Sequence, residues 1–367
     1  MVAVYQNAVP QRTSGSRRAT SRAQPDRHAP LQGSSLGRDL FLAGDVGGTK
    51  TLLEIGSLRN SSWVTLFSAR YFGAQHADFF SVLNKFFSEW TEEGHSPPRI
   101  KGACFGVAGP VFENRAELTN LPWSIDGAAI AKRFGITSVK VVNDFAAAAK
   151  GIELLGPSSD LVTLQSGEPV AGGPRVVLGP GTGLGVAYLV QAGTGYLVIA
   201  GEGGHAAFAP ATPEALDLLR DLYSRQERVS AENVISGPGL VRIYEFLCRR
   251  ENKAPRRATA MPADEGAAAI TEAALNLGDP MCLRALDLFI ACFGALAGDH
   301  ALAVMARGGV YIAGGIAPKI LPRLKQGKFC AAFNAKGRHS AVVEKIPVHV
   351  VTNARLGLLG AALLANE

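Results

Sequence analysis

Three glycine-rich segments, each placed directly after a short apolar run, constrain the fold of this 367-residue chain more than any other feature. They occupy residues 45–50, 179–185 and 313–318. Glycine is costly to order, so a dense cluster of it after a strand usually serves a close approach of the backbone to a ligand. The 42 glycines follow no fixed period, which excludes a collagen-like repeat. The pattern therefore predicts a globular protein with ligand-facing loops at strand ends.

The apolar periodicity around these loops predicts an α/β protein. Short apolar runs predict strands at residues 40–46, 51–57, 63–72, 100–108, 139–142, 175–178, 185–190, 196–199, 310–313 and 348–351. Apolar residues at helical spacing predict helices at residues 78–90, 125–134, 145–155, 214–223, 240–250, 265–277, 280–305, 318–324 and 356–365. Both halves begin with strands, turn at a glycine-rich loop and continue into helices, as expected of a duplicated α/β unit.

Length and composition predict two folded domains behind a basic extension. A chain of 367 residues exceeds the size at which a single hydrophobic core stops growing. Residues 1–39 are poor in bulky apolar side chains, so we expect a disordered extension, although an organellar transit peptide or a misplaced start codon would look similar. Residues 156–174 are rich in Gly, Pro and Ser and are expected to form the boundary or linker between the domains.

Charge and cysteine content exclude several classes of protein. The net charge is 37 − 31 = +6, and residues 1–39 contribute +4 of it through six arginines against two aspartates. The basic character thus belongs to the extension, and no nucleic-acid-binding motif accompanies it. The five cysteines include no C-x-x-C pair, which favours reduced thiols in a cytosol-like compartment. The most apolar stretch, residues 286–305, contains two aspartates and a histidine, so we expect no membrane span.

The first glycine-rich segment suits an anion and a metal-bound water. It combines a carboxylate, two glycines and a hydroxyl, in the order Asp45, Gly47, Gly48 and Thr49. Consecutive glycines let backbone N–H groups converge on an anion, and the neighbouring carboxylate can hold a metal-bound water. The alternative is an ordinary Gly-Gly turn in a hairpin.

The second and third segments are also expected to approach a ligand with their backbone. The second contains Gly181, Thr182 and Gly183 between two predicted strands. A dinucleotide fingerprint would open a helix there, whereas residues 186–190 have a strand pattern, so a Rossmann fold is disfavoured. The third contains Gly314 and Gly315 between a strand and a helix, which suits the flat face of a nucleoside, although any such turn favours glycine.

Polar side chains in three other segments are candidates for ligand binding. They are Asn143, Asp144, Glu202, His205 and Glu232. Asn143 and Asp144 follow an apolar strand, and strand ends are where α/β proteins bind ligands. The alternative for this pair is a plain helix cap, and Glu232 could lie in a solvated helix N-terminus capped by Ser230.

The joint order of these motifs resembles the hexokinase-like sugar kinases. It is most similar to the bacterial glucokinase family, which is separate from the zinc-containing repressor/ORF/kinase group. The motifs are D-x-G-G-T, N-D at a strand end, G-x-G-T-G-x-G, E-G-G-H, S-A-E and A-G-G-I, spread over residues 40–365. The absence of a Cys-rich zinc motif supports the glucokinase assignment.

The resemblance implies an actin-like ATPase fold with two ribonuclease-H-like domains and an interdomain cleft. Residues 40–155 and 347–367 would form the small domain, and residues 156–346 the large domain. Asp144 would be the general base. The sugar would be bound by Asn143, Asp144, Glu202, His205, Glu232 and Asn120. ATP would be bound by Asp45, Gly47, Gly48, Thr49, Gly181, Thr182, Gly183, Gly314 and Gly315, with Mg²⁺ held through ATP and Asp45. Lys50 departs from the Asn expected after G-G-T, which leaves its role open.

The expected activity is Mg²⁺-requiring, ATP-dependent phosphorylation of glucose at its 6-hydroxyl, the entry step of glycolysis, in the cytoplasm. Hydrogen-bonding groups for sugar hydroxyls, phosphate-binding loops and a candidate base are all present in the sequence. A nucleotide-binding oxidoreductase and a non-catalytic sugar sensor remain alternatives. The sequence leaves open ADP or polyphosphate as the phosphoryl donor, the tolerance of other hexoses, and whether the protein is a homodimer.

Overall fold

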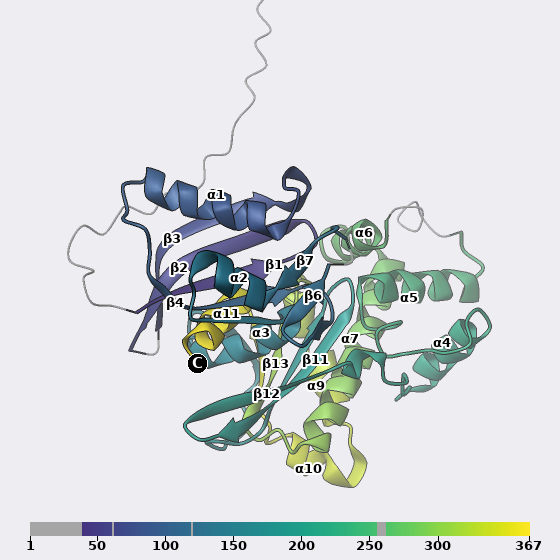
Figure 1. The fold of residues 1–367 in the computed structure, drawn as a ribbon. Helices are drawn as coiled ribbons and strands as arrows, with labels where there is room; N and C mark the ends of the chain where they lie inside the picture. The colour runs from purple at the N-terminus through teal and green to yellow at the C-terminus, as the bar shows by residue number, and fades with distance from the viewer. Residues whose placement is uncertain (1–38, 61, 119, 255–261) are drawn as a thin grey trace, which may run out of the picture. The chain divides into compact units, whose positions relative to one another are not determined.

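The structure is a computed structural model, and it describes residues 39–60, 62–118, 120–254 and 262–367 (Figure 1). The extension predicted over residues 1–39 lies outside the described residues, apart from Asp39. The described residues form two large β-sheets with helices on both, which confirms the predicted α/β class.

The first sheet has five strands in the order β3-β2-β1-β4-β8. Their bounds are β1 Leu40–Val46, β2 Lys50–Arg59, β3 Ser62–Phe72, β4 Ile100–Val107 and β8 Ser138–Asn143. β1 pairs antiparallel with β2 and parallel with β4, so an antiparallel meander continues into a parallel half. One face of this sheet buries α1 (Phe79–Glu92) through Phe79, Leu83 and Phe86. Asp78 starts α1 with a capping box that includes Ser81.

A small three-stranded sheet connects β4 to the next helix. It contains β5 (Val111–Phe112), β6 (Arg115–Glu117) and β7 (Ser124–Asp126), and α2 (Gly127–Phe134) follows. The helix predicted from residue 125 therefore starts two residues later. Asp126 caps it by accepting hydrogen bonds from the N–H groups of Ala128 and Ala129.

The second sheet has six strands in the order β12-β11-β10-β13-β14-β9. Their bounds are β9 Leu161–Gln165, β10 Arg175–Pro180, β11 Leu184–Ala192, β12 Gly195–Gly201, β13 Gly309–Ile312 and β14 Val348–Val351. The prediction of a linker over residues 156–174 must be corrected, because this segment contains the strand β9. β9 pairs antiparallel with β14, which lies far along the chain, so the local composition could not reveal the pairing.

The two sheets share one topology. In each, the first strand of the meander is central, two antiparallel strands follow on one side and two parallel strands lie on the other. β1, β2, β3, β4 and β8 thus correspond to β10, β11, β12, β13 and β14, and β9 is an addition to the second sheet. The predicted duplication of an α/β unit is therefore confirmed at the level of strand order.

Helices bury one face of the second sheet. They are α4 Pro213–Tyr223, α5 Gly237–Arg250, α6 Ala263–Leu275, α7 Pro280–Ala303, α8 Leu321–Leu324, α9 Lys328–Asn334 and α10 Ser340–Val343. Val176 and Leu178 of β10 face this helical core, while Val177 between them faces the other way, as the strand period of two requires. By length and composition α7 could cross a membrane. However, 67% of the residues in its most apolar 18-residue stretch are buried inside the protein, as in the core helix of a globular domain.

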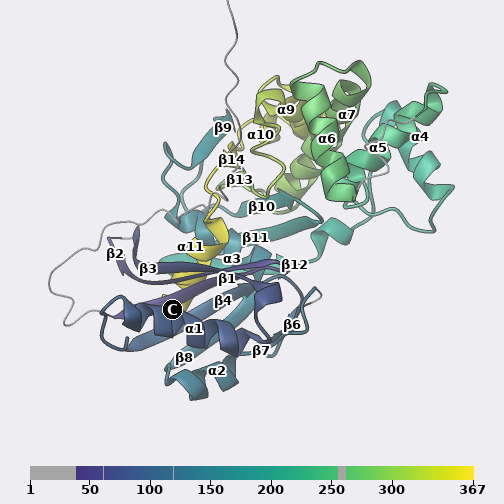
Figure 2. The same cartoon turned by 90° about the horizontal axis from the view of Figure 1, so that it is seen from above.

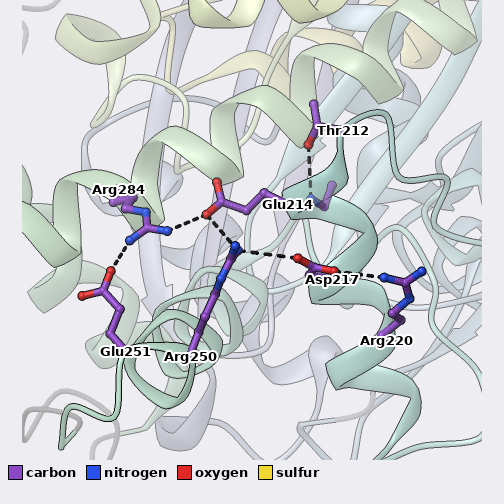
Figure 3. Close-up of polar contacts among 8 residues, drawn as sticks. Thr212, Glu214, Asp217, Arg220, Arg250, Glu251 and Arg284 are labelled. Carbon is purple, nitrogen blue, oxygen red and sulfur yellow. Dashed lines mark hydrogen bonds and ion pairs between the residues drawn. The ribbon is translucent and has the colours of Figure 1, made fainter.

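An ion-pair network joins α4, α5 and α7 (Figure 3). Glu214 of α4 accepts a hydrogen bond from Arg284 of α7 at 2.7 Å and lies 3.4 Å from Arg250 of α5. Arg284 also pairs with Glu251, and Arg250 lies 3.8 Å from Asp217. These side chains are partly exposed, so the pairs stabilise the fold only weakly.

Two helices lie between the two sheets (Figure 2). α3 (Asp144–Gly151) follows β8 and packs on β11 and β12, and α11 (Leu356–Asn366) follows β14 and packs on β1 and β4. They touch at backbone distance, because a Cβ on Gly360 would lie only 1.7 Å from the carbonyl oxygen of Ala147. The last part of the chain therefore contributes β14 to the second sheet and α11 to the first. The division into domains at residues 156 and 347 stays a prediction.

Candidate active site

Asn143 and Asp144 lie at the carboxyl end of β8, where α3 begins. Asn143 is the helix cap, since its Oδ1 accepts hydrogen bonds from the N–H groups of Phe145 and Ala146 at 2.9 and 3.2 Å. Its Nδ2 donates to the carbonyl of Gly109 at 3.1 Å. The capping role considered for either residue thus belongs to Asn143. Asp144 is the first residue of the helix.

The carboxylate of Asp144 is partly buried, and its pKa is raised. Burial raises its pKa above the ordinary value, against the lowering effect of the Phe145 N–H, which donates to Oδ1 at 2.7 Å. A carboxylate with a raised pKa is a better proton acceptor. Its position and environment therefore suit a general base.

Asp45 lies at the end of β1 and faces the same region. Burial and the negative charge of Asp144 raise the pKa of Asp45 from 3.8 to about 6. The two carboxylates are therefore close enough to repel each other, although they come from different strand ends. Gly357, near the start of α11, also faces Asp45: a Cβ there would lie 3.6 Å from the carboxyl carbon.

The turn after Asp45 forms the first glycine-rich loop, between β1 and β2. The Gly47 N–H donates to the carbonyl of Lys50 at 2.9 Å, which closes a tight turn. Gly48 has the Asn120 side chain against it, since a Cβ on Gly48 would lie 2.8 Å from Nδ2. Thr49 and Lys50 are exposed. The structure thus brings the predicted sugar contact Asn120 beside the predicted phosphate loop.

The second glycine-rich loop joins β10 to β11. The Gly181 N–H donates to the carbonyl of Gly183 at 2.8 Å, and the Gly181 carbonyl accepts from Gly237 N–H, also at 2.8 Å. Glu232 Oε2 accepts from the N–H of Leu184 at 2.9 Å. A Cβ on Gly183 would lie 2.6 Å from that oxygen, so a side chain at this position would displace the Glu232 carboxylate. Thr182 is exposed at the tip.

The segments that carry Glu202, His205 and Glu232 meet beside this loop. The Glu232 N–H donates to the carbonyl of Gly204 at 2.9 Å, so the segment 230–232 lies next to the segment 202–205. The side chains of Glu202 and His205 are 83% and 56% exposed, and Oε2 of the first lies 3.8 Å from Nε2 of the second. Both are therefore accessible to a polar ligand from solvent.

The third glycine-rich loop follows β13 and lies against the second. Gly314 has φ = +81°, and a Cβ there would lie 2.6 Å from the carbonyl oxygen of Pro180. A side chain at Gly315 would meet nothing within 4 Å. Gly314 therefore serves a close approach of two backbones, and Gly315 borders open space where a ligand can lie.

Phe145 joins the region of Asp144 to the second loop, and our sequence reasoning missed this function. Its ring contacts Gly179 and Gly185, which face each other across β10 and β11. The sequence signal that could have indicated this contact was a glycine on each side of the second loop, Gly179 and Gly185, where a large side chain can pack against the backbone. The structure thus assembles two clusters, one around Asp45, Asn120 and Asp144 and one around Glu232, with Phe145 between them.

Comparisons with known proteins support one family. A family model described as Glucokinase matches residues 42–367. The glucokinase of Synechocystis is 41% identical over 352 residues, which cover 89% of this chain and 98% of that protein. The crystal structure of a glucokinase from an Antarctic psychrotroph is 29% identical and aligns with a TM-score of 0.80 over 89% of this chain and 99% of that one.

A second solved structure shows the same fold at lower identity. It is a glucokinase from Balamuthia mandrillaris in complex with glucose, with a TM-score of 0.72 and 23% identity, covering 91% of this chain and 95% of that one. At this identity the likeness concerns the fold alone. Together these matches confirm the expected actin-like ATPase fold.

Proposed function

The chain belongs to the glucokinase family, and we propose that it transfers the γ-phosphoryl group of ATP to the 6-hydroxyl of glucose. The observation that carries the proposal is the meeting of two partly buried carboxylates, Asp45 and Asp144, beside glycine-rich loops in a chain of this family. Glucose 6-phosphate and ADP are the products.

Asp144 is the general base of the proposed mechanism. Its carboxylate accepts the proton of the 6-hydroxyl as the bond from that oxygen to the γ-phosphorus forms and the bond to the leaving oxygen of ADP breaks. The raised pKa of Asp144 favours proton acceptance. Asn143 holds the start of α3, and the N–H of Phe145 orients the carboxylate. Such positioning accounts for much of the rate enhancement in phosphoryl transfer.

The remaining predicted residues bind the two substrates. Glucose hydroxyls have potential partners in six side chains: Asn143, Asp144, Glu202, His205, Glu232 and Asn120. The phosphates lie along the glycine-rich turns of residues 47–49 and 181–183, and the nucleoside lies at Gly314 and Gly315. Carboxylates paired with amides and an imidazole suit hydroxyl groups, which both donate and accept hydrogen bonds.

The proposed reaction would also require Mg²⁺, bound together with ATP. The pair of Asp45 and Asp144 fits a hard cation, because oxygen ligands suit Mg²⁺ and a positive charge would relieve the repulsion that, after burial, contributes to the raised pKa of Asp45. Asp45 would hold the ion, directly or through its water. When bound, it neutralises charge on the phosphates.

The cellular setting is also part of the proposal. We place the enzyme in the cytoplasm at the entry of glycolysis, because its dispersed cysteines match a reducing compartment. We expect neither nucleic acid nor membrane as a partner, and a homodimer remains an open alternative.

A coupled assay tests the function directly. ATP, ADP and polyphosphate would each be offered with glucose, mannose and fructose, and product formation would be followed with Mg²⁺ present and after its chelation. We expect turnover with glucose and ATP that depends on Mg²⁺, and ³¹P NMR should place the new phosphate on the 6-oxygen. Glucose binding without turnover would indicate the sugar sensor instead, and nicotinamide binding without sugar-dependent ADP release would indicate the oxidoreductase.

A further inference from the structure

Phe145 is the second residue of α3 and directly follows Asp144. Its N–H donates to both Asn143 Oδ1 and Asp144 Oδ1, at 2.9 and 2.7 Å. The main chain of Phe145 therefore orients the carboxamide and the carboxylate at the end of β8. Its side chain points elsewhere in the site.

The ring of Phe145 occupies the space above the two glycines that flank the second phosphate loop. A Cβ on Gly179 would lie 2.3 Å from Cε2 of the ring, and a Cβ on Gly185 would lie 2.4 Å from Cγ and from Cδ2. Real Cβ atoms do not approach that closely, so both positions must lack a side chain while the ring is in place. Gly179 and Gly185 are cross-strand partners in β10 and β11, one residue outside Pro180 and Leu184.

Phe145 thus contacts both the carboxylate of Asp144 and the hairpin that carries the second glycine-rich loop. Its main chain orients the group that accepts the proton, and its ring supports the hairpin whose loop is expected to bind phosphate. We propose that Phe145 is a positioning residue that sets the placement of Asp144 relative to the second phosphate loop, so that the sugar hydroxyl and the γ-phosphoryl group meet in line. This inference rests on the proposed function and adds a determinant of it that touches neither substrate.

The contact makes a specific steric prediction. Replacing Phe145 by Leu removes Cε2 and Cζ, the ring atoms nearest to Gly179, whose Cβ would otherwise lie 2.3 and 3.0 Å from them. Gly179→Ala alone forces the ring to move, whereas Gly179→Ala together with Phe145→Leu lets the new methyl group take the vacated space. The two single variants and the double variant therefore form a test of complementary packing.

The experiment measures kcat, both KM values, glucose affinity by calorimetry and the thermal midpoint for the four proteins of this cycle. Misplacement of reacting groups by about 1 Å costs about 10²-fold in rate, so we expect each single variant to lose about 10²-fold in kcat, with glucose affinity changed less than about threefold. The double variant should recover to within about tenfold of the parent. Phe87→Leu, a partly buried ring on α1 away from the site, is the matched control, and it should lower the thermal midpoint without lowering kcat.

Two results would overturn the proposal. One is a kcat of Phe145→Leu within threefold of the parent, as the Phe87→Leu control is expected to show. The other is a double variant whose loss in kcat is the product of the two single losses, since independent effects would multiply. The parent's turnover of glucose with ATP reports on the proposed function alone, while the ratios among the variants report on Phe145, so the two ideas fail separately.

Discussion

The two halves of the molecule place a glycine-rich turn at the same position of the same sheet topology, but they equip it differently. In the first half the turn between β1 and β2 follows Asp45, whose pKa is raised to about 6. In the second half the turn between β10 and β11 has no carboxylate of its own and takes one from Glu232, which accepts the Leu184 N–H. One turn therefore follows its own carboxylate in the sequence, and the other contacts a carboxylate from a remote segment.

The helices that follow the last parallel strand of each sheet differ in the same way. α3 starts with the cap Asn143 and the carboxylate of Asp144. α11 has no side-chain cap, and Arg355 before it instead donates to the buried Glu54 of β2 at 2.5 Å. The repeated scaffold thus carries this carboxylate on one copy only, and a second carboxylate at the start of α11, where Gly357 faces Asp45, would add to the repulsion there. The repeated topology therefore determines where the turns and helices lie, and the residues at those places determine which polar groups they carry.

The largest expected effect tests this asymmetry at Asp144. Asp144→Asn keeps the shape and a hydrogen-bond acceptor but cannot take the proton of the hydroxyl. General bases contribute about 10²–10⁴-fold, so kcat should fall by that order while glucose affinity changes much less. Steady-state kinetics and calorimetry measure the two quantities. Turnover within a few-fold of the parent would remove Asp144 from the mechanism.

A second substitution tests the contact between the two loops of the second half. Gly314→Ala should destabilise the fold by about 2–4 kcal/mol and raise the KM for ATP, because it combines a positive φ with a methyl group 2.6 Å from the Pro180 carbonyl oxygen. Gly278→Ala is the control, since Gly278 has φ = +64° but open space around its Cβ. Urea unfolding of both variants separates the two costs. Equal losses would mean that the close approach is unimportant.

The carboxylate of the first turn should give the protein a distinctive pH dependence. The folded state holds a proton on Asp45 up to about pH 6, whereas the unfolded chain releases it near pH 4. The free energy of unfolding should therefore fall as pH rises through that window. Above pH 6 and without ligands, Asp45→Asn should be more stable than the parent by about 3 kcal/mol, and the gain should vanish near pH 4. Unfolding at several pH values tests this, and an unchanged difference between the proteins at every pH would contradict it.

The smallest effect is expected in the helices that only the second half adds over its sheet. Glu214→Gln removes the shared partner of Arg284 and Arg250 (Figure 3). Because the pairs are partly exposed, the loss should be at most about 1 kcal/mol, should shrink in 1 M salt, and should leave kcat unchanged. Thermal unfolding at two salt concentrations measures it. A loss that is large and independent of salt would give this network a greater role.

Local patterns predicted the parts of the fold that depend on neighbours in sequence. The strands around the glycine-rich loops and the strand-to-helix turn at Asp144 follow from periodicity within about ten residues. β9 was missed because its partner β14 is remote in the chain, and the short β5, β6 and β7 because two or three residues carry no period. The same limit applies to the site. Nothing local connects Asn120 with Gly48, or Phe145 with Gly179, since those contacts exist only after folding.

The crossing of α3 and α11 has a consequence for how the sequence can drift over time. A Cβ on Gly151 would lie 2.2 Å from the Leu356 carbonyl oxygen, and one on Gly360 would lie 1.7 Å from that of Ala147. Backbone atoms cannot move aside as a flexible side chain can. We therefore expect that no amino acid other than glycine is tolerated at either position. In a saturation library selected for activity, these two glycines should be depleted of substitutions as strongly as a catalytic carboxylate, although neither lies among the residues expected to touch a substrate.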